Sequence, residues 1–182
     1  TATAVTIPNG AKATLCNVKT HYYAVIGGLT SGAIWADSPT GTPGFLAATC
    51  ENLDLTIVTG SIVNNDWVTL TCKNITVQSG ATFNAGALAT QNVHVNGNIT
   101  INGVWNDGNC TLNMEGSAAQ SVSGTGYLKV QNWNITNAAG VDIDGLGVRV
   151  YGNMGLDNGG VLNTNDALIL ESDINGTGEI QS

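Results

Sequence analysis

Pairs of apolar residues, with one other residue between the two members, recur along this chain at an almost constant interval. The six pairs are Ile75/Val77, Val93/Val95, Leu112/Met114, Leu128/Val130, Val148/Val150 and Leu168/Leu170. A recurrence of roughly 16–20 residues is close to the period of the shortest solenoid repeats. The strands of a sandwich recur about every 8–12 residues without a longer period. The spacing therefore predicts a chain that winds in stacked coils.

Most repeats hold two further apolar clusters after the pair, separated by Gly, Asn or Asp. Val104 belongs to one of these clusters, which are expected to contribute inward side chains. Dipeptides such as Asn96-Gly97 and Asn158-Gly159 supply turns. Three short strands per repeat predict an all-β fold, a right-handed parallel β-helix with about 18–20 residues per coil. The step from Leu112 to Leu128 is the shortest and predicts a tightened or bulged coil. An antiparallel sandwich is the alternative fold.

Residues 1–71 differ from the rest because they hold all three prolines and show no match to the repeat. We interpret 1–71 as an N-terminal cap or lead-in region, since terminal repeats of solenoids are atypical. Residues 72–182 form the predicted coils. The repeat runs to the last residues, so we expect a mature or excised piece of a longer chain, with coils that continue beyond it or into another subunit.

The charge of the chain argues against nucleic acids and anionic membranes as partners. The formal net charge is −8, with only five Lys and Arg residues. Nucleic-acid binding needs a basic patch, and anionic membranes also attract basic segments. No run of about 18 apolar residues is present, so we expect no membrane insertion.

Four cysteines are candidates for disulfides: Cys16, Cys50, Cys72 and Cys110. An even number and a low charge favour an oxidising, extracellular setting. Cys16–Cys50 would tie the N-terminal region together, and Cys72–Cys110 would link neighbouring coils. Buried thiols are the alternative, because cysteine is often simply buried. No zinc-site spacing occurs, and we predict neither a metal site nor a cofactor.

Candidate catalytic groups are few. Asp142 and Asp144 alternate on one strand and so share a face, Arg149 follows in the same or the next turn, and Asp157 and Asp166 come later. A polysaccharide lyase or hydrolase needs such clustered carboxylates. A polar residue between two apolar ones is also the ordinary pattern of a half-buried strand. We therefore predict no catalytic residues and no enzyme activity.

Aromatic side chains offer a binding hypothesis. Trp105, Tyr127, Trp133 and Tyr151 lie in the coil region. If they point outward on one face, they provide a platform for stacking on sugar rings; if they point inward, they belong to the core. The sequence leaves both alternatives open.

Several segments resemble a known group of proteins. The segment 72–83, CKNITVQSGATF, looks like an opening coil of the large secreted β-helix proteins of Bacteroidota-type bacteria. Segments 122–130, 134–141 and 160–170 are similar to further coils, and 32–39, GAIWADSP, is similar to a lead-in that contains tryptophan. The resemblance implies a secreted or cell-surface stalk, adhesin or filament-forming element, often exported by the type IX route. It supplies no catalytic residues, and the sorting domain usual for that route is absent from this chain.

Together these observations predict an extracellular or cell-surface β-helix with a structural or adhesive function and no catalysis. The expected partners are further copies stacked end to end, surface glycans or other extracellular proteins. The alternatives are a polysaccharide-active enzyme and a carbohydrate-binding module.

Overall fold

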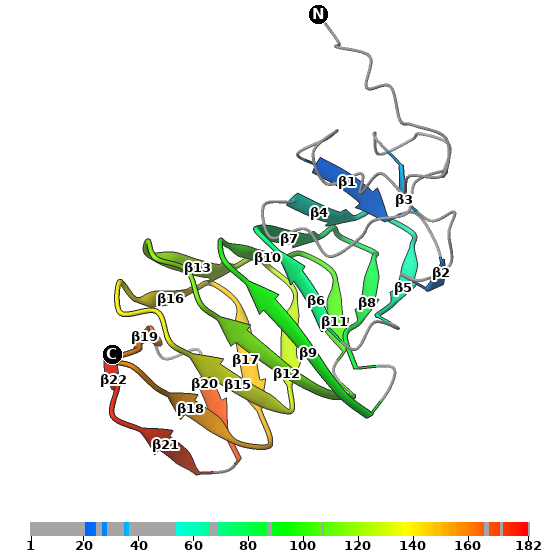
Figure 1. Cartoon of the computed structure of the whole chain (residues 1–182). Coiled ribbons are helices and arrows are strands. Elements are labelled where there is room, and N and C mark those ends of the chain that lie inside the picture. Colours follow the sequence, from blue (N-terminus) through cyan, green and yellow to red (C-terminus); the bar gives the residue numbers. More distant parts are fainter. Residues whose placement is uncertain are drawn as a thin grey trace, which may run out of the picture.

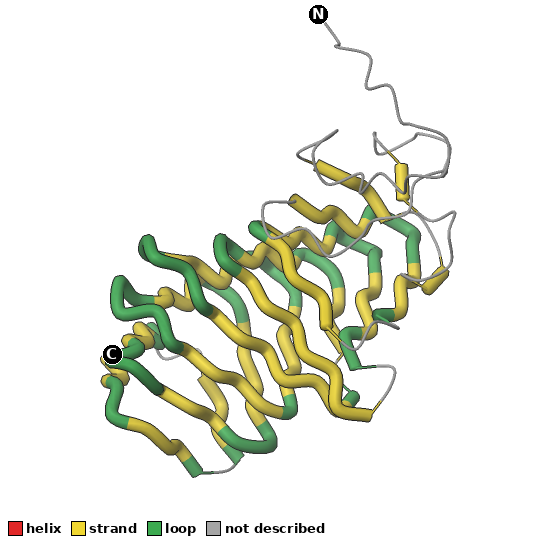
Figure 2. The backbone as a smooth tube through the Cα atoms, viewed as in Figure 1, coloured by secondary structure: helices red, strands yellow, loops and turns green. Residues whose placement is uncertain are grey.

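A computed structural model describes residues 21–24, 27–28, 35–36, 54–65, 69–86, 89–106, 108–165, 168–171 and 173–181. All regular elements in these ranges are β-strands, and they form three sheets that run side by side along the molecule (Figure 1). The sheets are made of stacked coils, and Figure 2 shows the backbone winding from one sheet to the next. The chain is therefore a β-solenoid, as the sequence predicted.

Each sheet collects one strand from every coil. Sheet A contains, in spatial order, β3 (Trp35–Ala36), β1 (His21–Ala24), β4 (Asp54–Ile57), β7 (Asn74–Val77), β10 (Ile99–Ile101), β13 (Gln120–Ser123), β16 (Val141–Asp144), β19 (Val161–Asn163) and β22 (Glu179–Gln181). Sheet B contains β2 (Gly27–Gly28), β5 (Ile62–Asn64), β8 (Thr82–Asn84), β11 (Val104–Asn106), β14 (Tyr127–Val130), β17 (Gly147–Val150) and β20 (Leu168–Leu170). Sheet C contains β6 (Thr69–Cys72), β9 (Ala89–Val95), β12 (Asn109–Met114), β15 (Asn132–Ile135), β18 (Met154–Leu156) and β21 (Ile174–Gly176). Six successive triplets, from β4–β5–β6 to β19–β20–β21, make the coils.

The coils are more variable in length than the sequence predicted. Long coils separate Ile75 from its register partner Ile99, and Ile99 from its partner Val122. A much shorter stretch of chain separates Leu162 from its partner Ile180. The coil length varies because the turns between strands differ in length while the strands keep their register.

The six apolar pairs do not occupy one sheet. Ile75/Val77 lies in sheet A, the next two pairs lie in sheet C, and the last three lie in sheet B. The step from Leu112 to Leu128 therefore passes from sheet C to sheet B, and the tightened coil predicted there is wrong. Leu112 pairs with Trp133 of the next coil in regular register, and the one register shift between β9 and β12 lies between Asn109 and Cys110.

The stacking begins earlier than residue 72. β4, β5 and β6 pair in parallel with β7, β8 and β9, and the boundary expected after residue 71 falls inside β6. β1 continues sheet A beyond β4, and β3 then pairs with β1 in the antiparallel direction. Much of the predicted cap, residues 1–71, lies outside the described residues.

The core is a column of inward side chains enclosed by the three sheets. Trp105 and Phe83 lie on adjacent strands of sheet B, are both fully buried, and make an edge-to-face contact with ring centroids 4.9 Å apart. Because Trp105 points inward, strand alternation turns its neighbour Val104 outward, where it is 42% exposed. The prediction that Val104 belongs with the inward residues is therefore wrong. Burying one such large side chain stabilises the fold by about 1.5–3 kcal/mol.

Buried amides close one corner of the solenoid. The side chain of Gln120 donates to the carbonyl oxygens of Val95 (2.9 Å) and Gly97 (2.5 Å). It accepts from the backbone N–H of Gly116 (2.9 Å) and from the side-chain amide of Asn137 (2.9 Å). These bonds satisfy backbone groups that lie between strands, where an unpaired buried group would be costly.

Candidate functional site

The outer faces of the coils carry ladders of polar side chains. On sheet A the amide of Asn74 donates to Asp54 (2.7 Å), and the backbone N–H of Asn98 donates to the Asn74 side chain (2.6 Å). The backbone N–H of Ser121 continues the ladder to the Asn98 side chain (2.9 Å). Strand alternation places these residues outward because their neighbours fill the core. On the described part of sheet A, these ladders provide the polar groups from which a site could be built.

The predicted carboxylate pair lies on this outer face. Asp142 and Asp144 share the outer side of β16, as the alternation predicted, and they line an open hollow of about 540 Å³. Its other lining residues are Ser121, Asn163, Asn165 and Gln181. Asp142 accepts a hydrogen bond from the side-chain amide of Asn163. The hollow thus offers mainly acceptors and amides.

The other residues of the candidate catalytic set lie elsewhere. Arg149 is on β17 of sheet B, where it forms an ion pair with Glu171. Asp157 is exposed directly after β18 of sheet C, and Asp166 lies outside the described residues. Among the described members of the set, Asp142 and Asp144 share one hollow, whereas Arg149 and Asp157 lie at other sheets.

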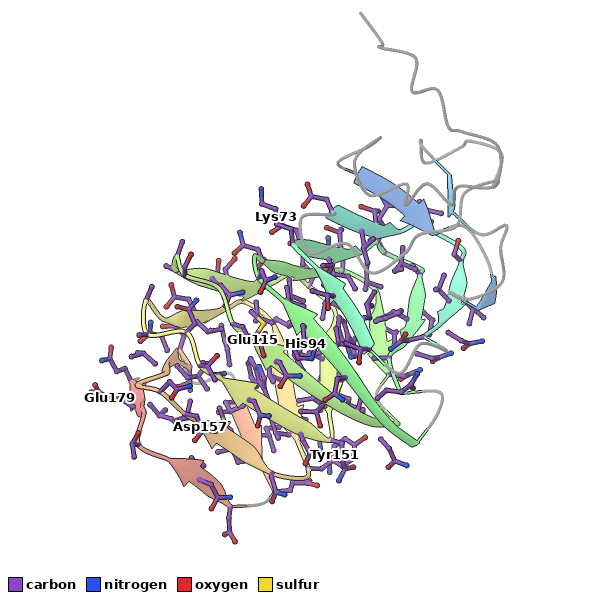
Figure 3. The ribbon with its side chains drawn as sticks, viewed as in Figure 1. Lys73, His94, Glu115, Tyr151, Asp157 and Glu179 are labelled. Carbon is purple, nitrogen blue, oxygen red and sulfur yellow. The ribbon has the colours of Figure 1, made fainter. Side chains whose placement is uncertain are left out.

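A His–Glu pair occupies the outer face of sheet C. His94 points outward between Val93 and Val95, and its Nδ1 atom lies 3.0 Å from Oε1 of Glu115 (Figure 3). Both side chains are partly exposed and line an open hollow of about 380 Å³ with Thr69, Thr71 and Asn96. The sequence signal for this contact is the separation of the two residues, which is one coil.

The outer face of sheet B combines cations and tyrosines. An open hollow of about 390 Å³ is lined by Asn106, Lys129, Arg149, Tyr151 and Glu171. Lys129 and Arg149 are direct register partners on β14 and β17. The hydrogen bond and the negative charge of Glu171 raise the pKa of Arg149, with a smaller contribution from Tyr127.

Sequence reasoning did not identify Lys129, Asn106 or Glu171 as site residues. Lys129 and Arg149 are separated by one coil on this part of the solenoid, and that spacing was the available signal. The spacing indicates that Lys129 and Arg149 are neighbours only once the coil length between β14 and β17 is known.

The predicted aromatic platform does not form as a set of four. Trp105 and Trp133 are fully buried in the core, so the outward alternative is wrong for both tryptophans. Tyr127 and Tyr151 are partly exposed, and the hydroxyl of Tyr151 donates to the carbonyl oxygen of Gly108 (3.3 Å). The outward aromatic surface of the predicted set is thus limited to the two tyrosines near the hollow of sheet B.

The predicted Cys72–Cys110 disulfide is absent from the described structure, where both residues are buried thiols. Cys72 is in register with Val95 and hence with Met114, whereas Cys110 lies four positions before Met114 on β12. That offset corresponds to about 13 Å along a strand, well beyond the roughly 7 Å between Cα atoms that a disulfide spans. Burial, with a smaller contribution from the charge of Asp54, raises the pKa of Cys72 to about 12. Cys16 and Cys50 lie outside the described residues.

Two further features are absent from the described ranges. No group of three or more His, Cys, Asp or Glu side chains there is arranged to hold a metal ion. The same ranges contain no helix with the length and hydropathy needed to cross a bilayer.

Comparison of the chain with protein-family models, curated proteins and solved structures gives no match. The geometry of the coils and their outer faces is therefore the basis for a functional proposal.

Proposed function

We propose that this β-solenoid is an extracellular or cell-surface structural or adhesive element that extends by end-to-end stacking and needs no catalysis. Its polar outer ladders, rich in Asn, Thr and Ser, support such a role because amides and hydroxyls hydrogen-bond well to glycans or to other proteins. The sequence resemblance to secreted β-helix proteins supports the same role.

The observation that carries the proposal is the exposure of apolar residues on the last strand of each sheet. These strands are β20, β21 and β22, and together we call them the terminal coil, although β20 and β21 also belong to the sixth triplet. Ile174 of β21 is in register with Met154, and both occupy inward positions. Met154 is fully buried, yet Ile174 is 45% exposed. Leu168 and Ile180 are likewise only partly buried, although their register partners Val148 and Leu162 are fully buried. One more coil stacked on this end would cover all three.

The two ends of the described coils also differ in their strand edges. At the N-terminal edge of sheet A, the antiparallel strand β3 covers β1. At the other end, β22, β20 and β21 are the edge strands of the three sheets (Figure 1). An uncovered edge offers unpaired N–H and C=O groups to another strand. A head-to-tail contact that does not close generates a filament, which is the assembly we propose.

Self-association tests this proposal. The mass of the wild-type chain is measured by light scattering after gel filtration over a concentration series, and we expect it to rise with concentration. Ile174→Lys places a charge on the inward side of the terminal coil and should keep the chain monomeric.

Ile169→Lys is the matched control. Ile169 lies on β20 of the same coil and is 55% exposed, but it is in register with Arg149 and so points outward. This variant should associate like the wild type. A wild-type chain that is monomeric at every concentration would contradict the proposal, and so would equal loss of association in both variants.

A further inference from the structure

The two adjacent cations on sheet B are unusual for this chain. It carries five Lys and Arg residues against a net charge of −8, and the described ones are Lys73, Lys129 and Arg149. Lys129 and Arg149 face outward on neighbouring strands, which lie about 4.8 Å apart. Like charges directly opposite each other destabilise a sheet. Folding stability therefore does not explain why these two cations lie side by side.

The neighbouring carboxylate neutralises only one of the two cations. Glu171 forms an ion pair with Arg149. Among the described residues, none forms an ion pair with Lys129, whose side chain is half-buried beside the hollow. The hollow therefore keeps an excess positive charge on a molecule that is acidic as a whole.

The groups around Lys129 are held in place. Arg149 donates hydrogen bonds to Glu171 and Tyr127, and the ring of Tyr127 lies against Gly147, where an added Cβ would come within 3.3 Å of it. The hydroxyl of Tyr151 is anchored to the carbonyl of Gly108 on a distant part of the chain. Positioned polar groups of this kind lower the entropic cost of binding.

The chemistry of the lining fits a particular ligand. A volume of about 390 Å³ lies within the range of small-molecule sites, roughly 300–1,000 Å³. Lys129 offers a cation, Asn106 and Glu171 offer hydrogen bonds to hydroxyl groups, and Tyr151 offers an aromatic ring. An acidic sugar carries all three matching features: a carboxylate, hydroxyl groups and an apolar ring face.

We propose that the hollow lined by Asn106, Lys129, Arg149, Tyr151 and Glu171 binds a carboxylate-bearing sugar unit of an acidic polysaccharide. The carboxylate lies beside Lys129, the sugar ring packs against Tyr151, and Asn106 and Glu171 bind the hydroxyl groups. This assignment rests on the proposed adhesive function and names the class of glycan to which the solenoid adheres.

Calorimetric titration of the full chain with polygalacturonate oligomers tests the site, with maltohexaose as a neutral glycan and polyglutamate as a carboxylate without a sugar. We expect binding of the polygalacturonate oligomers only, weakened by added salt. Lys129→Ala should weaken it at least tenfold. Lys73→Ala, which removes the same charge from an exposed position after β6 (Figure 3), should change it less than twofold.

Three patterns of binding would overturn the site. They are equal binding of polyglutamate, equal effects of Lys129→Ala and Lys73→Ala, and binding of maltohexaose in place of the acidic oligomers. The last outcome would leave an adhesive function intact. If none of the three probes binds, the site is overturned as well. The self-association experiment tests the structural function separately. Circular dichroism of both variants confirms that the fold is retained.

Discussion

The coil formed by β10, β11 and β12 and the terminal coil use similar apolar residues but bury them to very different degrees. Ile99, Ile101 and Leu112 are fully covered, whereas Ile174 at an equivalent inward position is 45% exposed. The difference comes from neighbours, because a coil inside the stack is covered on both sides. Solenoid stability is accordingly a sum of coil and interface terms, and the terminal coil lacks one interface.

The largest expected difference in stability comes from the same substitution made at an inner and at a terminal strand of one sheet. Leu128, Val148 and Leu168 are successive register partners of sheet B, but Leu128 is fully buried and Leu168 is only partly buried. Leu128→Ala should lower the free energy of unfolding by about 2–5 kcal/mol, and Leu168→Ala by about 1 kcal/mol. Urea denaturation measures both. Equal losses would show that the terminal coil is covered in solution.

The second comparison concerns turns inside and outside the stack. Gly124 has φ = +130°, and an added Cβ would overlap the carbonyl oxygen of Ile101 in the preceding coil. Gly159 has φ = +77° and open space around it. Gly124→Ala should therefore cost about 3 kcal/mol and Gly159→Ala about 1 kcal/mol, since only the first adds a clash to the backbone strain. Thermal unfolding of the two variants provides the measurement, and a reversed order would contradict the stacking at Gly124.

The third comparison concerns glutamines. Gln120 makes hydrogen bonds with four groups at a buried corner, whereas Gln181 is exposed on β22. Gln120→Leu should lower the free energy of unfolding by about 2 kcal/mol, because it leaves buried carbonyls without donors. Gln181→Leu should change it by less than about 0.5 kcal/mol. A neutral Gln120→Leu variant would mean that this corner is hydrated.

The smallest effect on stability near neutral pH is expected from the Cys72 thiol, whose burial is tested by alkylation. Because burial raises the pKa of this thiol to about 12, the folded protein should resist alkylation at pH 8, and the peptide that contains Cys72 should be labelled only in urea. An unfolded thiol has a pKa of 9.0, so unfolding releases a proton between pH 9 and about pH 12. The contribution of Cys72 to stability is thus fully present below pH 9 and is lost as the pH rises toward 12. Rapid labelling of the folded protein, detected by mass spectrometry, would contradict this burial.

The sequence by itself determined that short strands wind into a solenoid, because the alternation of apolar and polar residues and the turn residues are local features. It also placed Asp142 and Asp144 on one face of their strand, since the side chains of a strand alternate between its two faces.

Only the tertiary structure decided which strands stack on one another. Every strand repeats the same short apolar pattern, so the pattern alone did not show that the six pairs belong to three different sheets. The packing placed Trp105 inward beside Phe83 and its neighbour Val104 outward, although valine and tryptophan are both apolar. The same stacking brought Lys129 beside Arg149 and separated Cys72 from Cys110. These outcomes depend on the length of each coil, which varies with the turns between its strands, while packing between successive coils keeps the strands in register.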